Sequence, residues 1–326
     1  MKTTLIKMVL VCSIILAHNG LIHSQPSDIT VTIIEDGTNR TLLREIENNT
    51  RYLINTINER FRSDQNELLL DRERFDDHAL IKVIEMWENV RFFFDSHRLR
   101  EQLLIRGSGY QLRNIPIRIN GDTHYAVINF LKNGQISDFY VGLELHQYNN
   151  VMKHRSVEDK ARREIILNFI ENFRTAYIKK DIEFIENVFS EKALIITGRV
   201  IVPGNYDTDN IKSGFTERQV QYLVHTKQEY IQRLQGIFNV ISYLNLFFRD
   251  IDVRPHRKYA DFYGVWLDQE WNASNYSDRG YLFLLIQFRD NDFPLIWIRT
   301  WQDALDFEKG EMFGFHNFKI QGGTIQ

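Results

Sequence analysis

Two Asn-Gly pairs constrain the first half of this 326-residue chain more than any other feature of the sequence. Asn120-Gly121 and Asn133-Gly134 separate three runs in which apolar and polar side chains alternate, residues 110–119, 123–131 and 135–145. Asn-Gly favours the positive φ angles that a tight hairpin turn needs. The three runs are therefore expected to form an antiparallel meander, one face of which must be covered by other elements.

Two helices are predicted before the meander, because apolar residues recur there at helical spacing. The first helix is expected to begin at Thr41 and the second near Asp76 or Asp77, which are good N-cap residues. Residues 28–36 resemble a short strand. The apolar stripes consist of Leu43, Ile46, Leu53, Ile57 and Phe61 in the first helix, and of Leu80, Ile84, Trp87, Val90 and Phe94 in the second. Residues 25–150 are thus predicted to form an N-terminal α+β accessory domain.

The first 24 residues have the layout of a secretory signal peptide. Lys2 and Lys7 flank a short apolar run, and the small residue Ser24 precedes Gln25. The apolar run is too short to cross a bilayer. The sequence therefore predicts export, with cleavage near Ser24-Gln25 and a periplasmic or extracellular location for the mature protein.

Cleavage at this site would change the chemistry of the chain. The only cysteine, Cys12, lies in the predicted signal peptide, so the mature chain would have no thiol for a disulfide, a nucleophile or a metal site. Two lysines and no acid are removed, so the formal net charge would move from −3 to −5. A mildly acidic surface with scattered basic residues argues against a nucleic-acid partner. No other apolar stretch is long enough for a membrane span.

The second half is predicted to place its helices before its strands. A helix is expected around residues 166–177, and Asp181 is expected to cap a shorter helix. Residues 193–202 resemble a strand. A third helix is predicted to begin at Thr216, which with Gln219 has the spacing of a capping box, and to continue through Phe238. Four strands are then expected at 242–253, 258–271, 279–289 and 294–302, with a fifth near 313–320. Residues 146–157 are interpreted as the linker between the two domains.

The run ILNFIENFRTAYIKKDIEFIENVFSEKALIITG, residues 166–198, resembles the opening of the nuclear transport factor 2-like (cystatin-like cone) superfamily. The resemblance covers residues 157–320 and implies a curved antiparallel sheet wrapped around helices, with a pocket inside the cone. Members include ketosteroid isomerase, scytalone dehydratase, polyketide cyclases and binding or dimerisation modules without catalysis. The chain also resembles a group of exported bacterial proteins of the Bacteroidetes, and its N-terminal unit resembles a shortened copy of the same architecture. Fold membership does not by itself carry a function.

Candidate ligand-binding residues lie in the segment FPLIWIRTWQ, residues 293–302. Strict strand alternation predicts that Trp297, Arg299 and Trp301 share one face. An arginine between indole rings can hold a carboxylate, and tryptophan and arginine are also enriched at protein interfaces. The stripe is therefore interpreted as part of a ligand pocket, as an interface with the first domain or a second subunit, or as an exposed row of side chains that binds nothing. Trp266 and Tyr263, on the strand 258–271, complete the predicted ligand-binding set.

Three residues are weak candidates for catalysis. Asp268 and Glu270 share a predicted strand face with Trp266, and an apolar environment would raise the pKa of such an acid, as a general base requires. Arg299 is expected to be their partner. His225 and Glu229 are four residues apart on the helix predicted from Thr216, so Glu229 could orient His225 as a base. Each of these side chains has a structural alternative, an ordinary ion pair or a solvated surface contact.

No sequence motif indicates a cofactor, and the acid-poor turns at 205–210 and 272–280 are not assigned a metal. The preferred hypothesis is an exported, non-catalytic module that binds a small molecule or a protein, including a second copy of the chain through the sheet face. The alternative hypothesis is an isomerase, dehydratase or cyclase that uses a pocket carboxylate as general base.

Overall fold

The structure is a computed structural model of residues 1–326. The predicted signal peptide lies outside the residues that it describes. The described ranges are 29–34, 39–106, 109–153, 157–201, 219–288, 293–304, 312–321 and 324–325. Within them, no helix is both long enough and apolar enough to cross a membrane.

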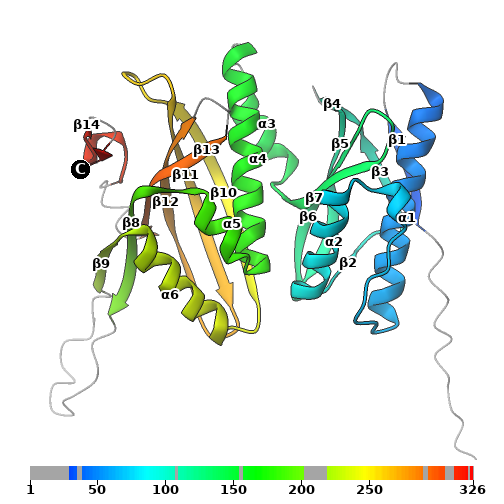
Figure 1. The fold of residues 1–326 in the computed structure, drawn as a ribbon, viewed down its shortest axis with the longest axis horizontal. Helices are drawn as coiled ribbons and strands as arrows, with labels where there is room; N and C mark the ends of the chain where they lie inside the picture. The colour runs from blue at the N-terminus through cyan, green and yellow to red at the C-terminus, as the bar shows by residue number, and fades with distance from the viewer. Residues whose placement is uncertain are drawn as a thin grey trace, which may run out of the picture.

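The N-terminal half combines two helices with a five-stranded sheet, in the order β2-β5-β6-β7 with β4 also paired to β5, and a separate parallel pair, β1-β3 (Figure 1). Two helices followed by an antiparallel meander were predicted from the sequence. The helices are α1 (Arg40–Arg62) and α2 (Asp77–Val90), and the side chains of Asn39 and Asp76 cap their N-termini. The strands are β1 (Thr30–Ile34), β2 (Phe92–Phe94), β3 (Arg98–Gln102), β4 (Leu104–Arg106), β5 (Gly109–Ile119), β6 (Asp122–Phe130) and β7 (Ile136–Gly142). Asn120 and Gly121 have φ of 50° and 88°, so the first predicted hairpin turn is confirmed.

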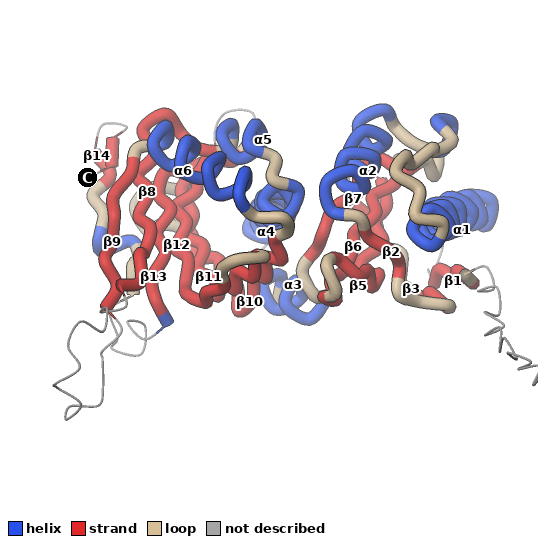
Figure 2. Tube along the Cα trace, turned by 90° about the horizontal axis from the view of Figure 1, so that it is seen from below, coloured by secondary structure: helices blue, strands red, loops and turns tan. Residues whose placement is uncertain are grey.

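The C-terminal half packs three helices against a six-stranded sheet in the order β10-β11-β12-β13-β8-β9. Its helices are α4 (Val157–Lys179), α5 (Ile182–Asn187) and α6 (Lys227–Val240). The strands are β8 (Phe189–Ile201), β9 (Gln219–His225), β10 (Leu244–Pro255), β11 (Phe262–Ala273), β12 (Ser277–Phe288) and β13 (Pro294–Asp303). All neighbouring strands are antiparallel except β13 and β8. Helices on a curved, mainly antiparallel sheet are the cone architecture that the resemblance implied (Figure 2).

Four local predictions were wrong. The second helix ends at Val90, so Phe94, which was expected on its apolar stripe, lies instead in strand β2. The helix expected from Thr216 to Phe238 is instead strand β9 followed by α6, and the capping box is formed by Thr226 and Glu229. A β-branched and aromatic run, QVQYLVH, favours the strand over the helix. The expected linker contains a helix, α3 (Leu145–Met152), and the fifth strand expected at 313–320 is largely irregular with one 3₁₀ turn, Phe315–Asn317.

A β-bulge in β13 divides the tryptophan stripe between the two faces of the sheet. Leu285 of β12 pairs with Ile298 and Ile286 pairs with Ile296, so Trp297 is the extra residue on β13. A bulge shifts the alternation by one position. Arg299 and Trp301 therefore lie on the face covered by the helices, here called the concave face, whereas Trp297 joins the apolar cluster of the opposite, convex face.

The convex face is covered by the chain's own C-terminal segment, residues 312–320. Its aromatic side chains Phe313, Phe315 and Phe318 pack on a cluster that contains Trp297 and Phe283. The segment is also held by hydrogen bonds, one from the Trp266 indole N–H to the Phe313 carbonyl at 2.9 Å and one from the Tyr259 hydroxyl to the Ile320 carbonyl at 3.0 Å. The convex apolar surface around Trp297 is thus buried within the chain.

The two halves of the chain meet through buried charged side chains on α4. Arg113 of β5 forms an ion pair with Glu171 of α4, and both side chains are almost fully buried. Glu171 also accepts a hydrogen bond of 2.7 Å from the backbone N–H of Leu143. One turn further along α4, Arg174 contacts the Nδ1 atom of His124 at 3.0 Å. Because these partners are paired across the boundary, the contact fixes how the halves pack.

His124 makes this contact sensitive to acid. The ring is buried and stacks on Phe247 at a centroid distance of 4.6 Å. Burial, followed by the positive charge of Arg174, lowers the pKa of His124 from 6.5 to about 3. The folded protein therefore keeps His124 neutral at pH values at which the unfolded chain binds a proton.

We expect the free energy of unfolding to fall as the pH decreases from 6.5 towards 3, with a contribution from His124 of up to about 1.4 kcal/mol per pH unit. Above pH 6.5 this contribution is fully present, because His124 is neutral in both states. The measurement is urea unfolding across this range for the wild type and for His124→Gln, which retains polarity without titrating. Equal slopes for the two proteins would show that His124 does not contribute.

Candidate functional site

A cavity of about 470 Å³ lies on the concave face between α6 and the sheet. Its volume is within the range of small-molecule sites, about 300–1,000 Å³. The walls combine apolar side chains of α6, including Leu234 and Ile237, with Trp271 of β11 and with Arg299 and Trp301 of β13. The concave face therefore carries an open cavity with both apolar and cationic walls.

Arg299 is the most unusual group in this cavity. Its side chain is only 5% exposed, yet its Nε and Nη1 atoms have no hydrogen-bond partner among the described residues. The guanidinium carbon lies 5.2 Å from the centre of the Tyr230 ring, and the side chain forms a hydrogen bond with Tyr177. A buried cation with unused donors is costly unless an acceptor is supplied. An anionic ligand would supply it.

Trp301 contributes a further unused donor beside Arg299. Its indole Nε1 is buried and has no partner among the described residues. The ring lies close to the sheet because the neighbouring strands carry glycines there: a Cβ atom at Gly198 would come within 2.1 Å of the indole, and one at Gly280 within 2.6 Å. Two glycines on flanking strands thus make room for this tryptophan.

Tyr230, which lines the cavity, and Arg299 are both hydrogen-bonded to a second tyrosine, Tyr177. The hydroxyl groups of Tyr177 on α4 and Tyr230 on α6 are hydrogen-bonded to each other. Burial, followed by the proximity of Tyr230, raises the pKa of Tyr177 well above 10. Tyr177 therefore stays protonated near neutral pH and can serve as a fixed dipole beside Arg299.

Of the predicted ligand-binding residues, the structure brings Arg299 and Trp301 together and separates the others from them. Trp297 and Trp266 belong to the convex cluster beneath the C-terminal segment. Tyr263 is on the concave face but is buried in the core against Phe288 and does not line the cavity. The strict alternation used for the prediction fails at the bulge, which places Trp297 on the other face from Arg299.

The predicted carboxylates do not line the cavity either. Asp268 and Glu270 occupy the face of β11 that carries Trp266, as predicted, but that is the convex face. Asp268 accepts two hydrogen bonds of 3.1 Å from the Nε atom of Arg279. Their expected pairing with Arg299 is therefore wrong, because Arg299 faces the opposite side of the sheet.

Glu270 forms an ion pair with Arg249. Burial raises the pKa of Glu270, but hydrogen bonds from Arg249 and Asn272 outweigh burial and hold the pKa below its ordinary value. A general base near neutral pH needs the opposite shift. The structure therefore gives Glu270 the geometry of a structural ion pair.

His225 lies at the end of β9 and not on a helix. Its Nε2 atom is 2.9 Å from the Thr197 hydroxyl. Burial, then the charge of Arg233, lowers its pKa. Glu229, which was expected to orient His225, instead accepts hydrogen bonds from the backbone N–H and the hydroxyl of Thr226 in the capping box. The predicted pairing of His225 with Glu229 was thus wrong: Glu229 belongs to the capping box of α6, and His225 lies on the preceding strand.

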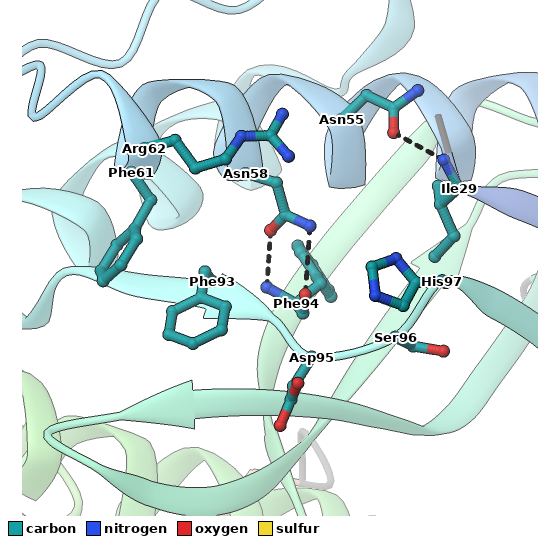
Figure 3. Close-up of a pocket in the computed structure, with 10 residues that line it drawn as sticks. All are labelled: Ile29, Asn55, Asn58, Phe61, Arg62, Phe93, Phe94, Asp95, Ser96 and His97. Atoms are coloured by element: carbon teal, nitrogen blue, oxygen red, sulfur yellow. Dashed lines mark hydrogen bonds between the residues drawn. The ribbon is translucent and has the colours of Figure 1, made fainter. Parts of the chain in front are cut away.

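A second cavity, of about 340 Å³, lies in the N-terminal half between α1 and the segment 93–97 (Figure 3). Its asparagines are already used by the backbone. Asn58 accepts from the N–H of Phe94 at 2.7 Å and donates to the same residue's carbonyl at 3.0 Å, and Asn55 accepts from the N–H of Ile29. No unpartnered buried polar atom is found among its described lining residues, so it has weaker features of a ligand site than the concave cavity.

Sequence reasoning missed Tyr230 and Asp278, which line the concave cavity, and Tyr177, which is hydrogen-bonded to Tyr230 and Arg299. The two tyrosines were read as ordinary members of apolar helix stripes. Asp278 of β12 lies in a turn-like run, Asn-Tyr-Ser-Asp, which gave no signal for a pocket. Among the described residues, no group of three or more histidine, aspartate or glutamate side chains is arranged to hold a metal ion.

No protein-family model matches the chain. No curated protein matches it either. Solved structures resemble parts of it at low identity. One is Bd1075 from Bdellovibrio bacteriovorus, with 15% identity over 46% of this chain and a TM-score of 0.34; the match spans 43% of the Bd1075 chain.

Two further matches cover nearly all of the other chain. An NTF2-like protein from Cytophaga hutchinsonii has 15% identity over 44% of this chain and 98% of its own, with a TM-score of 0.32. Aln2 from a Streptomyces species has 8% identity over 49% of this chain and 100% of its own, with a TM-score of 0.33.

The two buried arginines are expected to respond differently to replacement by methionine. Arg113→Met leaves Glu171 buried without its partner, so we expect a loss of about 3–5 kcal/mol in the free energy of unfolding. Arg299→Met removes a cation that has two unused donors, so we expect a change within about 1 kcal/mol in the absence of ligand.

The measurement is chemical denaturation of both variants at neutral pH. A large destabilisation by Arg299→Met, similar to that by Arg113→Met, would mean that Arg299 has a structural role that its contacts do not reveal.

Proposed function

We propose that this chain is an exported, non-catalytic module that binds a small organic anion in the concave cavity. The observation that carries the proposal is the buried guanidinium of Arg299, whose Nε and Nη1 atoms have no partner among the described residues. A hydrogen bond to a charged group stabilises by about 1.5–3 kcal/mol, and a carboxylate matches the planar donor edge of an arginine. The cavity provides space for such a ligand beside apolar walls.

Charge around the cavity favours the same class of ligand. The lining residues include three arginines, Arg199, Arg233 and Arg299, against one acid, Asp278, so the lining carries an excess of positive charge. Cationic side chains around an opening raise the local concentration of anions and speed their association, in a way that depends on salt. This arrangement supports a carboxylate over a cation or a neutral polar molecule, although the whole chain carries a formal net charge of −3.

Export and the bacterial relationship belong to the same proposal. They are supported by the signal-peptide layout of residues 1–24 and by the resemblance to exported proteins of the Bacteroidetes. We expect N-terminal sequencing of protein collected from the periplasm or medium of a bacterial host to begin at Gln25. Recovery of the chain in the cytoplasm with Met1 intact would contradict export.

The binding proposal is tested by a thermal-shift screen with a broad panel of small carboxylates, each paired with its neutral amide. We expect a subset of the carboxylates to raise the melting temperature of the wild type, and the amides to have smaller effects. Arg299→Met should abolish the shifts. The matched control is Arg249→Met, because Arg249 pairs with Glu270 on the convex side, away from the cavity.

Absence of any carboxylate-specific shift across the panel would overturn the binding proposal. Equal loss of binding in Arg249→Met and Arg299→Met would show that the effect comes from stability and not from the cavity.

An isomerase or dehydratase reaction is the second candidate, and one observation favours it. Asp278 lines the same cavity as Tyr230 and Arg299, so a carboxylate, a phenol and a guanidinium converge there. These are the groups that abstract a proton and stabilise an oxyanion. Compounds that bind are therefore incubated with the protein and followed by NMR. Turnover that is lost in Asp278→Asn would favour this candidate, whereas unchanged compounds support the non-catalytic module.

A further inference from the structure

The concave cavity has a polar inner end and an apolar outer end. At the inner end, the unpartnered donors are Nε and Nη1 of Arg299 and Nε1 of Trp301, all of them buried. Arg299 and Trp301 are two positions apart on β13 and share its concave face. Residues at this spacing on one strand face are close enough for one small group to contact both. A single carboxylate has four acceptor positions and can satisfy all three donors.

The outer end of the cavity is formed by aliphatic side chains that continue to the protein surface. Ile237 and Val240 of α6 line the cavity and are also 43% and 69% exposed. Leu234, which is one turn before Ile237 and is buried, also lines the cavity. The apolar wall therefore runs along α6 from the interior to solvent.

We propose that the ligand is an amphipathic monocarboxylate with an alkyl chain, bound with its carboxylate inside and its chain along α6. This inference rests on the proposed binding function and specifies the class of ligand and its orientation. The carboxylate satisfies the buried donors of Arg299 and Trp301. The alkyl chain covers the aliphatic row Leu234, Ile237 and Val240, which is otherwise exposed at its outer end.

The opposite orientation is disfavoured by the same contacts. With the alkyl chain inside, the donors of Arg299 and Trp301 would be buried against hydrocarbon without an acceptor, which is costly. The carboxylate would then lie outside near Arg233, where water screens its charge. A polar dicarboxylate would leave the aliphatic row uncovered or would bury its second charge against it.

The experiment measures dissociation constants by calorimetry for hexanoate, octanoate, decanoate and 1-decanol with the full mature chain. Burial of each added methylene strengthens binding by about threefold to fourfold. We expect affinity to increase by about this factor per methylene until the chain leaves the aliphatic row. We expect 1-decanol to bind at least about tenfold more weakly than decanoate, because it lacks the charge that pairs with Arg299.

Variants then locate the two ends of the ligand. Arg299→Met should weaken hexanoate and decanoate by similar factors, because both place the carboxylate at the same inner site. Val240→Ser should weaken decanoate by about threefold or more and leave hexanoate nearly unchanged, because only a long chain reaches the outer rim. Val224→Ser is the matched control, since Val224 is 64% exposed on β9 but does not line the cavity.

The outcomes separate this inference from the proposed function. If short or polar carboxylates bind through Arg299 without any dependence on chain length, the amphipathic class is wrong and the binding function stands. If affinity depends on chain length but not on Arg299, the orientation is wrong. If hexanoate, octanoate and decanoate do not bind but other carboxylates of the thermal-shift panel do, the amphipathic ligand class is wrong and the proposed binding function stands. If no carboxylate of the panel binds, both this inference and the proposed binding function are wrong.

Discussion

The buried ion pair between Arg113 and Glu171 is the interaction on which the arrangement of the whole chain depends. It joins the N-terminal sheet to α4, and α4 in turn packs against the C-terminal sheet. Glu171 faces the first half, whereas Tyr177, six residues later, forms hydrogen bonds with Tyr230 and Arg299, which line the concave cavity. One helix therefore carries both the contact between the halves and a side chain, Tyr177, that holds two residues of the candidate site. A change in how the halves pack would be transmitted to the cavity through this helix, because packed interiors deform little.

Arg113 and Arg299 show how the surroundings of a buried arginine indicate its role. Each side chain is nearly inaccessible, and each lies over a tyrosine ring. Arg113 is neutralised by Glu171, as expected for a structural cation. Arg299 has no ion pair among the described residues, keeps two unused donors and faces a cavity. Burial alone would lower the pKa of Arg299, but the two neighbouring tyrosines and the charge of Asp278, which lines the same cavity, together raise it. A ligand acceptor would satisfy the two donors that stay unused. Gly198 and Gly280 leave room for the Trp301 ring on the same face of the sheet.

The sequence predicted the architecture well and the site only in part. Local signals were sufficient for the helix cap at Asp76, the Asn-Gly turn and the four long strands, because each depends on residues close together in the chain. The first helix was expected to begin at Thr41, whereas its cap is Asn39, two residues earlier. The bulge at Trp297 could not be predicted, since it is fixed by the register with β12 and β8. The C-terminal segment that covers Trp266 is also distant in sequence. The arginines that pair with Asp268 and Glu270, Arg279 and Arg249, lie on the neighbouring strands β12 and β10. Arg299 and Trp301 share one face of β13, as predicted, but the bulge separates Trp297 from them, and their role in ligand binding stays a prediction.

The most direct test of the binding hypothesis is a crystal structure of the mature protein with decanoate. The carboxylate is expected within hydrogen-bonding distance of Arg299 Nε or Nη1 and of Trp301 Nε1, with the alkyl chain extending past Ile237 to Val240. Decanoate bound with its carboxylate outside near Arg233, or bound only in the N-terminal cavity, would contradict the hypothesis. So would an experimental structure in which the donors of Arg299 and Trp301 are all satisfied by protein acceptors.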